Sequence, residues 1–316
     1  MEQRAILDTN ADTALLRLAL AVRDTGYSFV TPTPATIARV NARQGTEWAG
    51  DLRGVFGWSR PFRPGLLPAG LLSLMRQARV LDDGPDGSRS LVRLSNLQGG
   101  MFLHSAYPTI AADAVFFGPD TYRFANAILA HPQPHGRCRA VDIGCGAGPG
   151  AILLALAHPQ AEIWAVDIND AALRLTGINA ALAGVTVHLA NSDLLTGLDG
   201  SFDLIVANPP YLIDPAERAY RHGGGALGAG LSLRILDTAL DRLAPGGTLL
   251  LYTGAAVVDG LDRFHGAVAG RLAGVDAAWS YRELDPDVFG EELEGGAYAA
   301  ADRIAAVLLT LTIRNA

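Results

Sequence analysis

The chain has 316 residues, 49% hydrophobic and 18% charged, so it can bury a sizeable core and is long enough for about two domains. All 25 basic side chains are arginine, which excludes mechanisms that need a Schiff-base lysine or a phosphate-binding lysine loop. The net charge of -7 is uneven, because residues 1–115 carry 12 arginines and 10 acidic residues whereas residues 116–316 carry 13 and 22. Such an acidic chain is a poor nonspecific binder of nucleic acid.

Residues 1–114 are predicted to form a small N-terminal α+β domain that selects the substrate. Apolar spacing predicts helices at 11–24, 33–43 and 66–79, and two alternating runs at 90–97 and 100–107 predict a hairpin. Helices followed by a hairpin suggest a winged-helix-like arrangement. The first ten residues have no cationic segment followed by an apolar run, and the two cysteines are too few for a disulfide framework. We therefore expect a cytoplasmic protein without a signal peptide.

Seven arginines of this first part form a candidate surface for an anionic partner, with nucleic acid as one possibility. They are Arg53, Arg60, Arg63, Arg76, Arg79, Arg89 and Arg93. Aspartates at 51, 82, 83 and 86 are interleaved with them, which favours an ordinary solvated surface instead. The nearby aromatic residues are open to the same two interpretations, core packing or base stacking; they are Trp48, Phe56, Trp58 and Phe62.

Residues 115–316 alternate between strands and helices, which predicts a doubly wound, Rossmann-like α/β domain with a seven-stranded parallel sheet. The predicted strands are 138–143, 161–168, 185–191, 202–207, 247–252, 276–283 and 304–313. The predicted helices are 120–130, 148–158, 170–183, 229–243 and 257–273. An uncharged run at 143–161 contains four glycines and two prolines, so we interpret it as core rather than as a membrane span.

A glycine-rich turn follows the first strand of this second part. The sequence VDIGCGAGPG places Gly144, Gly146 and Gly148 between a predicted strand and a predicted helix. Glycines at such a switch point permit a tight turn and the close approach of a ligand to backbone N–H groups. Dinucleotide enzymes use a similar turn, so the turn alone does not identify the ligand.

Three aspartates at successive strand ends favour a nucleoside with a cationic amino-acid tail. Asp142 precedes the turn and can accept from an ammonium group, Asp167 can accept both hydroxyls of a ribose, and Asp193 can meet an adenine amino group. A pyrophosphate would be poorly matched by so many acids. A nicotinamide-dependent oxidoreductase is kept as an alternative.

The fourth strand ends in Asn208-Pro209-Pro210-Tyr211. Two prolines fix the backbone and offer no N–H, so the Asn208 side-chain oxygen and the Pro209 carbonyl form a rigid pair of acceptors. A planar NH2 group can donate one hydrogen to each while Tyr211 stacks on or edges its plane. Acceptors placed off that plane favour a pyramidal nitrogen and hence the transition state of nitrogen alkylation. The motif predicts transfer of a methyl group to a planar nitrogen.

Together, these motifs resemble the class I S-adenosylmethionine-dependent methyltransferases, and the NPPY sequence resembles those that modify glutamine in release factors or exocyclic amines of adenine or guanine. The segments HGGGALGAG and VFFGPDTYRF are similar to the glutamine-modifying group. The resemblance implies S-adenosyl-L-methionine as cofactor. It also implies roles for particular residues: Asp142, Gly144, Gly146 and Gly148 at the methionine end, Asp167 at the ribose, Ser192 or Asp193 at the adenine, and Asn208 beside both cofactor and acceptor. Pro119, Asp120 and Thr121 are expected near the methionine end.

The sequence therefore predicts an N-methyltransferase with Asn208, Pro209 and Tyr211 as catalytic residues. A protein glutamine or similar amide is the first substrate class, a nucleic-acid exocyclic amine the second and a small metabolite the third. A noncatalytic S-adenosylmethionine-binding protein is the alternative from another class. His104, His222 and the acids of 283–298 are candidates for substrate contact or for purely structural roles. No spacing supports a metal site, and no membrane partner is expected.

Overall fold

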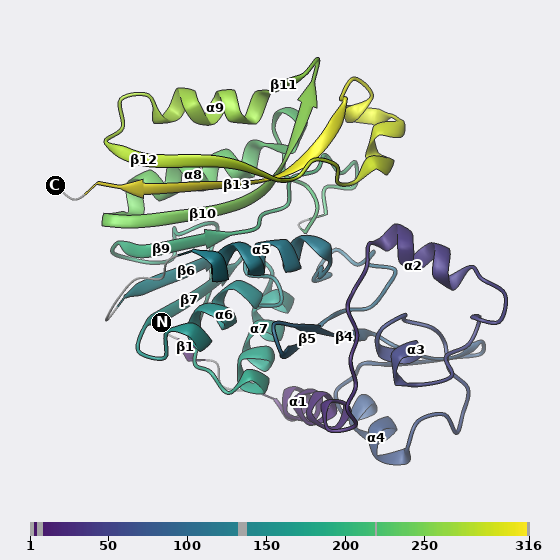
Figure 1. Ribbon diagram of the computed structural model, residues 1–316. Coiled ribbons are helices and arrows are strands. Elements are labelled where there is room, and N and C mark those ends of the chain that lie inside the picture. Colours follow the sequence, from purple (N-terminus) through teal and green to yellow (C-terminus); the bar gives the residue numbers. More distant parts are fainter. Residues whose placement is uncertain (1–2, 5–8, 132–137, 219, 315–316) are drawn as a thin grey trace.

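The computed structural model describes residues 3–4, 9–131, 138–218 and 220–314 (Figure 1). Its centre is a sheet of seven principal strands, which confirms the predicted Rossmann-like α/β class. In spatial order these strands are β8 (His188–Asn191), β7 (Glu162–Asp167), β6 (Arg139–Ile143), β9 (Phe202–Ala207), β10 (Leu243–Val258), β13 (Arg303–Ile313) and β12 (Ala277–Asp285). Two short strands extend it: β1 (Gln3–Arg4) pairs with β8, and β11 (Leu261–Asp262) pairs with β10.

The sheet is mixed rather than wholly parallel. Strands β8, β7, β6, β9 and β10 run parallel to one another, whereas β13 lies antiparallel between β10 and β12. The predicted parallel sheet is therefore wrong at this end. The carboxyl ends of the five parallel strands still meet at one edge, which is where ligands bind in open α/β sheets.

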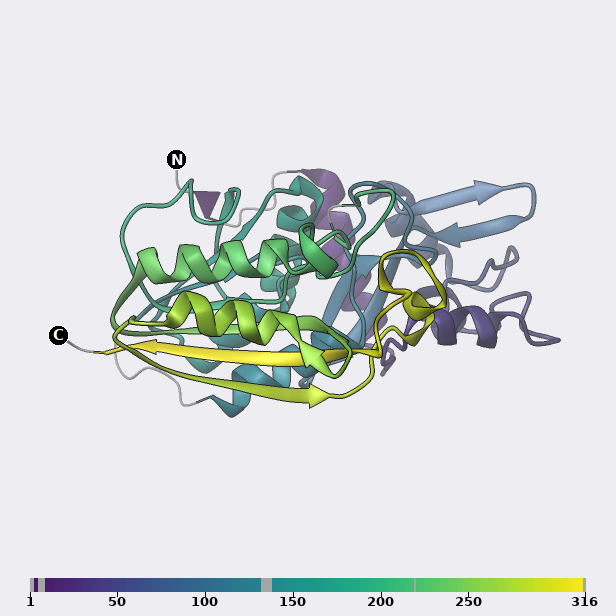
Figure 2. The same cartoon turned by 90° about the horizontal axis from the view of Figure 1, so that it is seen from above.

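Helices cover both faces of the sheet (Figures 1 and 2). Helices α5 (Pro119–Ala130), α6 (Pro149–Ala157) and α7 (Asp170–Ala183) pack on one face, and α8 (Gly230–Arg242) and α9 (Arg263–Leu272) pack on the other. The strands show the period of two that this requires. Ala140 belongs to the cluster with α5–α7, for example, and its neighbour Val141 belongs to the cluster with α8 and α9.

The first 114 residues are α+β, as predicted. They hold α1 (Asn10–Arg23), α2 (Pro34–Asn41), α3 (Leu52–Phe56) and α4 (Ala69–Gln77), with the hairpins β2 (Leu81–Gly84)–β3 (Gly87–Ser90) and β4 (Val92–Leu97)–β5 (Gly100–Ser105). The predicted hairpin is β4–β5. The β2–β3 hairpin was missed because the DDGPDG sequence has no alternating apolar residues. The apolar core is continuous from α1 and β5 into α7.

The predicted helix at 257–273 begins too early. Strand β10 continues to Val258, and α9 begins only at Arg263. Between β10 and β11, Asp259 and Gly260 have φ of 53° and 73°, the left-handed values that a two-residue hairpin turn requires. Asp-Gly between apolar runs is a hairpin signal, and it outweighs the helical spacing here.

The uncharged run at 143–161 contains the end of β6, the glycine turn and the nine-residue helix α6. No helix in the described part of the chain is both long enough and apolar enough to cross a membrane.

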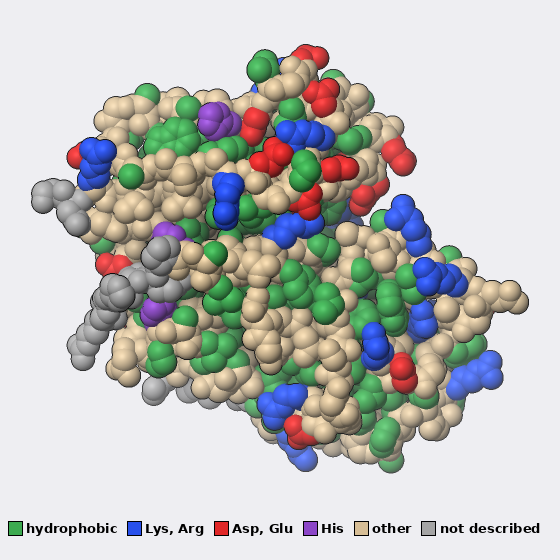
Figure 3. All heavy atoms as spheres, viewed as in Figure 1, with side chains coloured by type: hydrophobic (Ala, Val, Ile, Leu, Met, Phe, Trp, Pro, Cys, Tyr) green, Lys and Arg blue, Asp and Glu red, His purple; other side chains and the backbone are tan. Residues whose placement is uncertain are grey.

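One of the seven candidate arginines does not lie on the surface. Six are exposed or half-buried, but Arg93 is only 2% exposed, so it cannot belong to a surface for a large partner. Burial lowers the pKa of Arg93 to about 10. Phe56 and Phe62 lie in the core, and Trp58 packs against Phe29. Figure 3 shows arginines over this part and acidic side chains over the β12–β13 connection.

Two leucines of α6 test the packing of this fold. Leu154 is 1% exposed against the sheet, so Leu154→Ala should lower the free energy of unfolding by about 2–5 kcal/mol. Leu156, in the same helix, is 48% exposed, and Leu156→Ala should change it by less than about 0.5 kcal/mol. Urea unfolding measures both values. Equal losses in the two variants would contradict the assigned faces of α6.

Candidate active site

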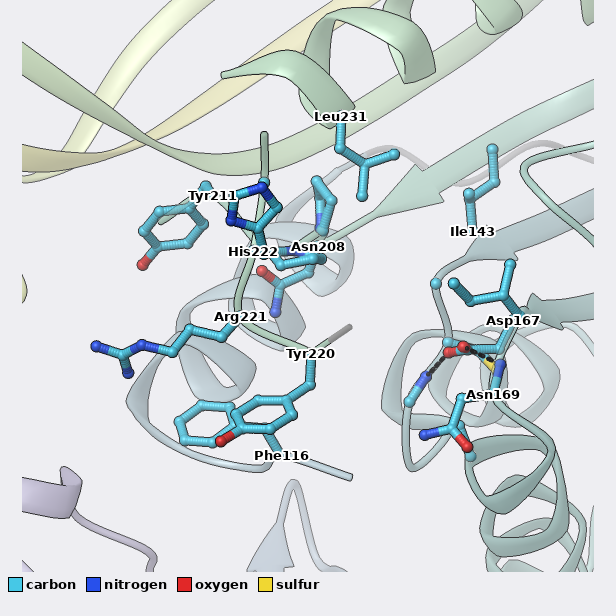
Figure 4. Close-up of a pocket in the computed structure, with 18 of the residues that line it drawn as sticks. Phe116, Ile143, Asp167, Asn169, Asn208, Tyr211, Tyr220, Arg221, His222 and Leu231 are labelled. Carbon is cyan, nitrogen blue, oxygen red and sulfur yellow. Dashed lines mark hydrogen bonds between the residues drawn. The ribbon is translucent and has the colours of Figure 1, made fainter. Parts of the chain in front are cut away.

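A cavity of about 690 Å³ opens at the carboxyl ends of β6, β7 and β9 (Figure 4). The Asp167 side lies across it from Asn208 and Tyr220. Predicted site residues that line it are Asp142, Gly144, Gly146, Asp167, Ser192, Asp193, Asn208, Pro209 and Tyr211. The fold thus brings together residues that are far apart in sequence, and it leaves one of the predicted set, Gly148, outside the lining.

The glycine turn after β6 wraps around the end of β7. Gly144 and Cys145 both donate their N–H to the Val166 carbonyl, at 2.9 and 3.0 Å. Gly144 and Gly146 have φ of 69° and 56°, in the left-handed region that disfavours larger residues. Gly148 has a packing role, because a Cβ there would lie 2.7 Å from Thr176 Cγ2.

Asp142 is a buried carboxylate at the end of β6. The Ala151 N–H donates to its Oδ2 at 2.9 Å. A Cβ at Gly150 would lie 2.6 Å from that same oxygen, so the glycine is needed for the close approach. Burial raises the pKa of Asp142 to about 7, partly offset by the Ala151 bond, and Asp167 raises it further. The site therefore stabilises a positive charge that would share this space.

Asp167 holds the glycine turn in place at the end of β7. Its carboxylate accepts from the N–H of Gly146 at 3.0 Å and from the N–H of Asn169 at 2.9 Å. Burial raises its pKa, and these backbone bonds oppose the shift. Each oxygen keeps a further lone pair, so the carboxylate can still accept from hydroxyl groups in the cavity.

The residues predicted at the adenine end follow β8. The Ser192 hydroxyl accepts from the Gly197 N–H at 2.9 Å. Asp193 is paired with Arg234 of α8, NH2 to Oδ2 at 2.8 Å, and both side chains are exposed. Sequence reasoning missed Arg234, which also lines the cavity. The Asp193 carboxylate therefore already has a partner within the chain, although both Asp193 and Arg234 line the cavity.

Asn208 and Pro209 form the other wall. Asn208 directly follows β9, and its amide has no hydrogen-bond partner among the residues that the structure describes. Pro209 and Pro210 constrain the backbone beside it. An acceptor oxygen left without a partner at the wall of a cavity is available to a ligand that donates N–H groups.

Tyr211 does not present its hydroxyl to the cavity. The hydroxyl donates to Asp120 Oδ2 at 2.7 Å, and the ring meets Phe289 edge-on at 5.8 Å. Figure 4 shows the ring directed away from the Asn208 amide. Burial raises the pKa of Tyr211 well above its usual value, with Asp120 adding to the shift. The Tyr211 hydroxyl is therefore committed to this buried contact, whereas stacking on or edging of a planar substrate by its ring stays a prediction.

An aromatic pair that sequence reasoning missed lies on the acceptor side. Phe116 and Tyr220 are stacked, with centroids 6.3 Å apart and planes 10° apart, and both line the cavity. The Tyr220 hydroxyl donates to the Thr109 carbonyl at 2.5 Å. These rings add flat apolar surface to the cavity that Asn208 and Tyr211 also line.

The two candidate histidines have different outcomes. His104 is buried, stacks on Phe117 and bonds Ser95 through Nε2 at 2.8 Å, so it is a core residue. Burial lowers its pKa well below the usual value. His222 lines the cavity, and its Nδ1 accepts from the Asp214 N–H at 3.1 Å. In its neutral form His222 therefore carries its proton on Nε2 and is a donor there.

Acidic residues of the connection between β12 and β13 form ion pairs with arginines of the same chain. Asp285 pairs with Arg123 at 2.6 Å, and Glu292 pairs with Arg221. Phe289, between them, contacts Tyr211. These contacts favour a structural role for the segment over binding of a cationic substrate.

The cavity has hydrogen-bond acceptors and backbone groups that suit S-adenosyl-L-methionine. Its acidic groups suit an ammonium and ribose hydroxyls, and the positive-φ turn exposes backbone to the ligand. In the described residues, no group of histidine, cysteine and acidic side chains is placed to hold a metal ion.

Residues 109–257 match the family model of the methyltransferase small domain. A release factor glutamine methyltransferase of Deinococcus radiodurans is 36% identical over 171 residues, covering 51% of this chain and 61% of the relative. A ribosomal protein uL3 glutamine methyltransferase of Neisseria meningitidis is 38% identical over 127 residues, covering 36% and 42%. The matched part spans less than two thirds of either relative.

Among solved structures, a T. thermophilus 16S rRNA N2 G1207 methyltransferase in complex with AdoMet and guanosine has a TM-score of 0.46 at 18% identity, covering 78% of this chain and 62% of that one. So distant a likeness carries no inference about the substrate. Residues 109–257, which hold both the glycine turn and Asn208, are thus similar to the methyltransferase small domain, and the predicted resemblance to S-adenosylmethionine-dependent methyltransferases is confirmed.

Proposed function

We propose that this protein transfers a methyl group from S-adenosyl-L-methionine to the side-chain amide nitrogen of a glutamine in a protein. The observation that carries the proposal is the Asn208 amide, which no described residue bonds and which lies beside Pro209 in the same cavity as Asp142 and Asp167. The names of the relatives support it, since both act on glutamine. The paired acceptors suit a primary amide, which has two N–H groups to donate.

The two carboxylates would hold the cofactor. Asp142 would balance the methionine ammonium, Asp167 would accept from the ribose hydroxyls, and the segment at Ser192 would meet the adenine. When bound, S-adenosyl-L-methionine supplies a methyl group on a positively charged sulfur. An acidic wall favours this cation over a pyrophosphate, which the same carboxylates would repel.

The chain's own contribution at the acceptor is positioning. Asn208 Oδ1 and the Pro209 carbonyl would each accept one hydrogen of the amide, which turns the nitrogen lone pair out of conjugation. Phe116 and Tyr220 would limit the positions available to the flat amide group. In its neutral form His222 accepts from Asp214 at Nδ1 and is a donor at Nε2, so neither ring nitrogen has a free lone pair to accept a proton from the amide.

Methylation of defined acceptors tests the proposal. The protein is incubated with radiolabelled S-adenosyl-L-methionine and, in parallel, with glutamine-containing peptides, the same peptides carrying glutamate, total RNA, DNA and small-molecule lysate fractions. We expect label only in the glutamine peptides, with mass spectrometry placing one methyl group on the side-chain nitrogen. Label confined to nucleic acid or to small molecules would refute a protein substrate.

Asn208→Ala tests the acceptor pair. Loss of one hydrogen bond to the reacting group should lower kcat by about 10²–10³-fold, while the Kd of S-adenosyl-L-methionine changes by less than about threefold. The matched control is Asn191→Ala at the end of β8, because Asn191 bonds Asp170 at 2.7 Å and does not line the cavity. Steady-state kinetics and calorimetry separate the two effects. An unchanged kcat in Asn208→Ala would remove Asn208 from the reaction.

Asp142 should make cofactor binding depend on pH. Its pKa is raised to about 7, so the carboxyl becomes neutral below that pH and no longer balances the ammonium. Calorimetric affinity should fall by up to about tenfold per pH unit below neutrality. In Asp142→Asn the affinity should be weaker and its pH dependence should disappear over the same range. A wild-type affinity that stays constant from pH 5 to pH 7 would contradict the assignment.

The folding stability of the wild type should depend on pH in the opposite sense to its cofactor affinity. Because the fold favours the neutral form of Asp142, wild-type stability should fall as pH rises from the ordinary carboxyl range toward about 7. Asp142→Asn lacks this ionisation, so its free energy of unfolding without cofactor should exceed that of the wild type at pH 8, with a smaller difference at pH 4. Urea unfolding of the two proteins measures this difference and also tests whether Asp142→Asn folds.

A further inference from the structure

We propose that Asp120 is a positioning residue for the acceptor site, acting through Tyr211 to fix the Asn208–Tyr211 segment. The inference rests on the proposed function for its effect on catalysis. It assigns Asp120 a role different from contact with the methionine end of the cofactor, which the family resemblance implied.

Asp120 is the centre of a buried set of hydrogen bonds in the first turn of α5. Its Oδ2 accepts from the Tyr211 hydroxyl at 2.7 Å, and its Oδ1 accepts from the Tyr252 hydroxyl at 2.6 Å. Arg123 NH1 also donates to Oδ1 at 3.2 Å. Three donors therefore hold the carboxylate in one orientation and occupy three of its about four acceptor sites, so little of its hydrogen-bonding capacity is left for a ligand ammonium.

The scaffold around this set is rigid. Arg123 also donates to Asp285 at 2.6 Å, which ties α5 to the end of β12. Tyr252 lies on β10, and Gly254, two residues on, faces the same side of that strand. A Cβ at Gly254 would lie 2.1 Å from the Tyr211 ring, so the missing side chain is what admits that ring.

Tyr211 transmits this rigidity to the acceptors. It directly follows Pro210, and prolines at 209 and 210 leave little freedom in φ between Tyr211 and Asn208. Asn208 is fixed from the other end by β9. With both ends of a four-residue segment anchored, the Asn208 oxygen and the Pro209 carbonyl keep one relative position.

The chain offers a matched pair of variants. Tyr211→Phe and Tyr252→Phe each remove one hydroxyl bonded to Asp120, but only Tyr211 belongs to the acceptor segment. Tyr211→Phe should lower kcat for a glutamine peptide by about 10–100-fold, with the peptide KM and the cofactor Kd within about twofold. Tyr252→Phe should keep kcat within about threefold of the wild-type value, although its Tm should fall at least as far as that of Tyr211→Phe. Equal losses of kcat in the two variants would show a merely structural network and overturn the proposal.

A double-mutant cycle tests whether Asp120 acts through Tyr211. Asp120→Ala should lower kcat as Tyr211→Phe does. The kcat of the double variant should lie within about twofold of that of Tyr211→Phe alone. Losses that multiply would mean that Asp120 acts independently. If Asp120→Ala does not fold, the comparison of Tyr211→Phe with Tyr252→Phe still tests the positioning role.

Hydrogen exchange gives a reading that does not need an acceptor. The amides of Leu212 and Ile213 donate to the Arg221 carbonyl and the Tyr298 hydroxyl, at 3.2 and 3.0 Å. Tyr211→Phe should speed their exchange by about tenfold, whereas Tyr252→Phe should leave it near wild type. If the wild type methylates no glutamine, the proposed function fails while this comparison still decides the positioning role. Unchanged exchange in Tyr211→Phe would overturn it.

Discussion

The structure depends on how the chain turns at the carboxyl edge of the sheet without leaving polar groups unpaired. The left-handed turn after β6 is held from two sides, by the Val166 carbonyl and by the Asp167 carboxylate, while Asp142 accepts from the first turn of α6. These bonds keep two carboxylates beside one cavity. Burial there disfavours the ionised form of Asp142, and its pKa is raised for that reason. A bound cation would offset that cost, so the same constraint shapes both the turn and its ligand.

The opposite wall meets a different demand. A weakly nucleophilic amide nitrogen gains little from a reactive side chain and much from acceptors in fixed positions. In the proposed function these acceptors are Asn208 and the carbonyl beside it, in a segment anchored by β9 and by the buried contact of Tyr211 with Asp120. On this proposal the wall at Asn208 acts through backbone restraint, and the wall at Asp142 and Asp167 acts through charge.

Much of this could be predicted from the sequence, because strand alternation and glycine or proline motifs are local signals. The strands that carry Asp142, Asp167 and Asn208 lie where predicted, and Asn208 faces the cavity. The orientation of Tyr211 could not be predicted, because two distant residues set it. Asp120 lies 91 residues earlier in the chain and accepts from the Tyr211 hydroxyl, and Gly254 lies on β10 and leaves room for the ring. Likewise, the pairing of Asp193 with Arg234 and the stacking of Phe116 on Tyr220 depend on tertiary contacts between distant segments.

A crystal structure with S-adenosylhomocysteine and a glutamine peptide tests the central claim most directly, namely that Asn208 and Pro209 hold the nitrogen that receives the methyl group. The account predicts the glutamine amide nitrogen at about 2.7–3.2 Å from both the Asn208 Oδ1 and the Pro209 carbonyl oxygen, with the ribose hydroxyls on Asp167. A glutamine amide bound away from Asn208, or an adenine ring occupying that position, would contradict it.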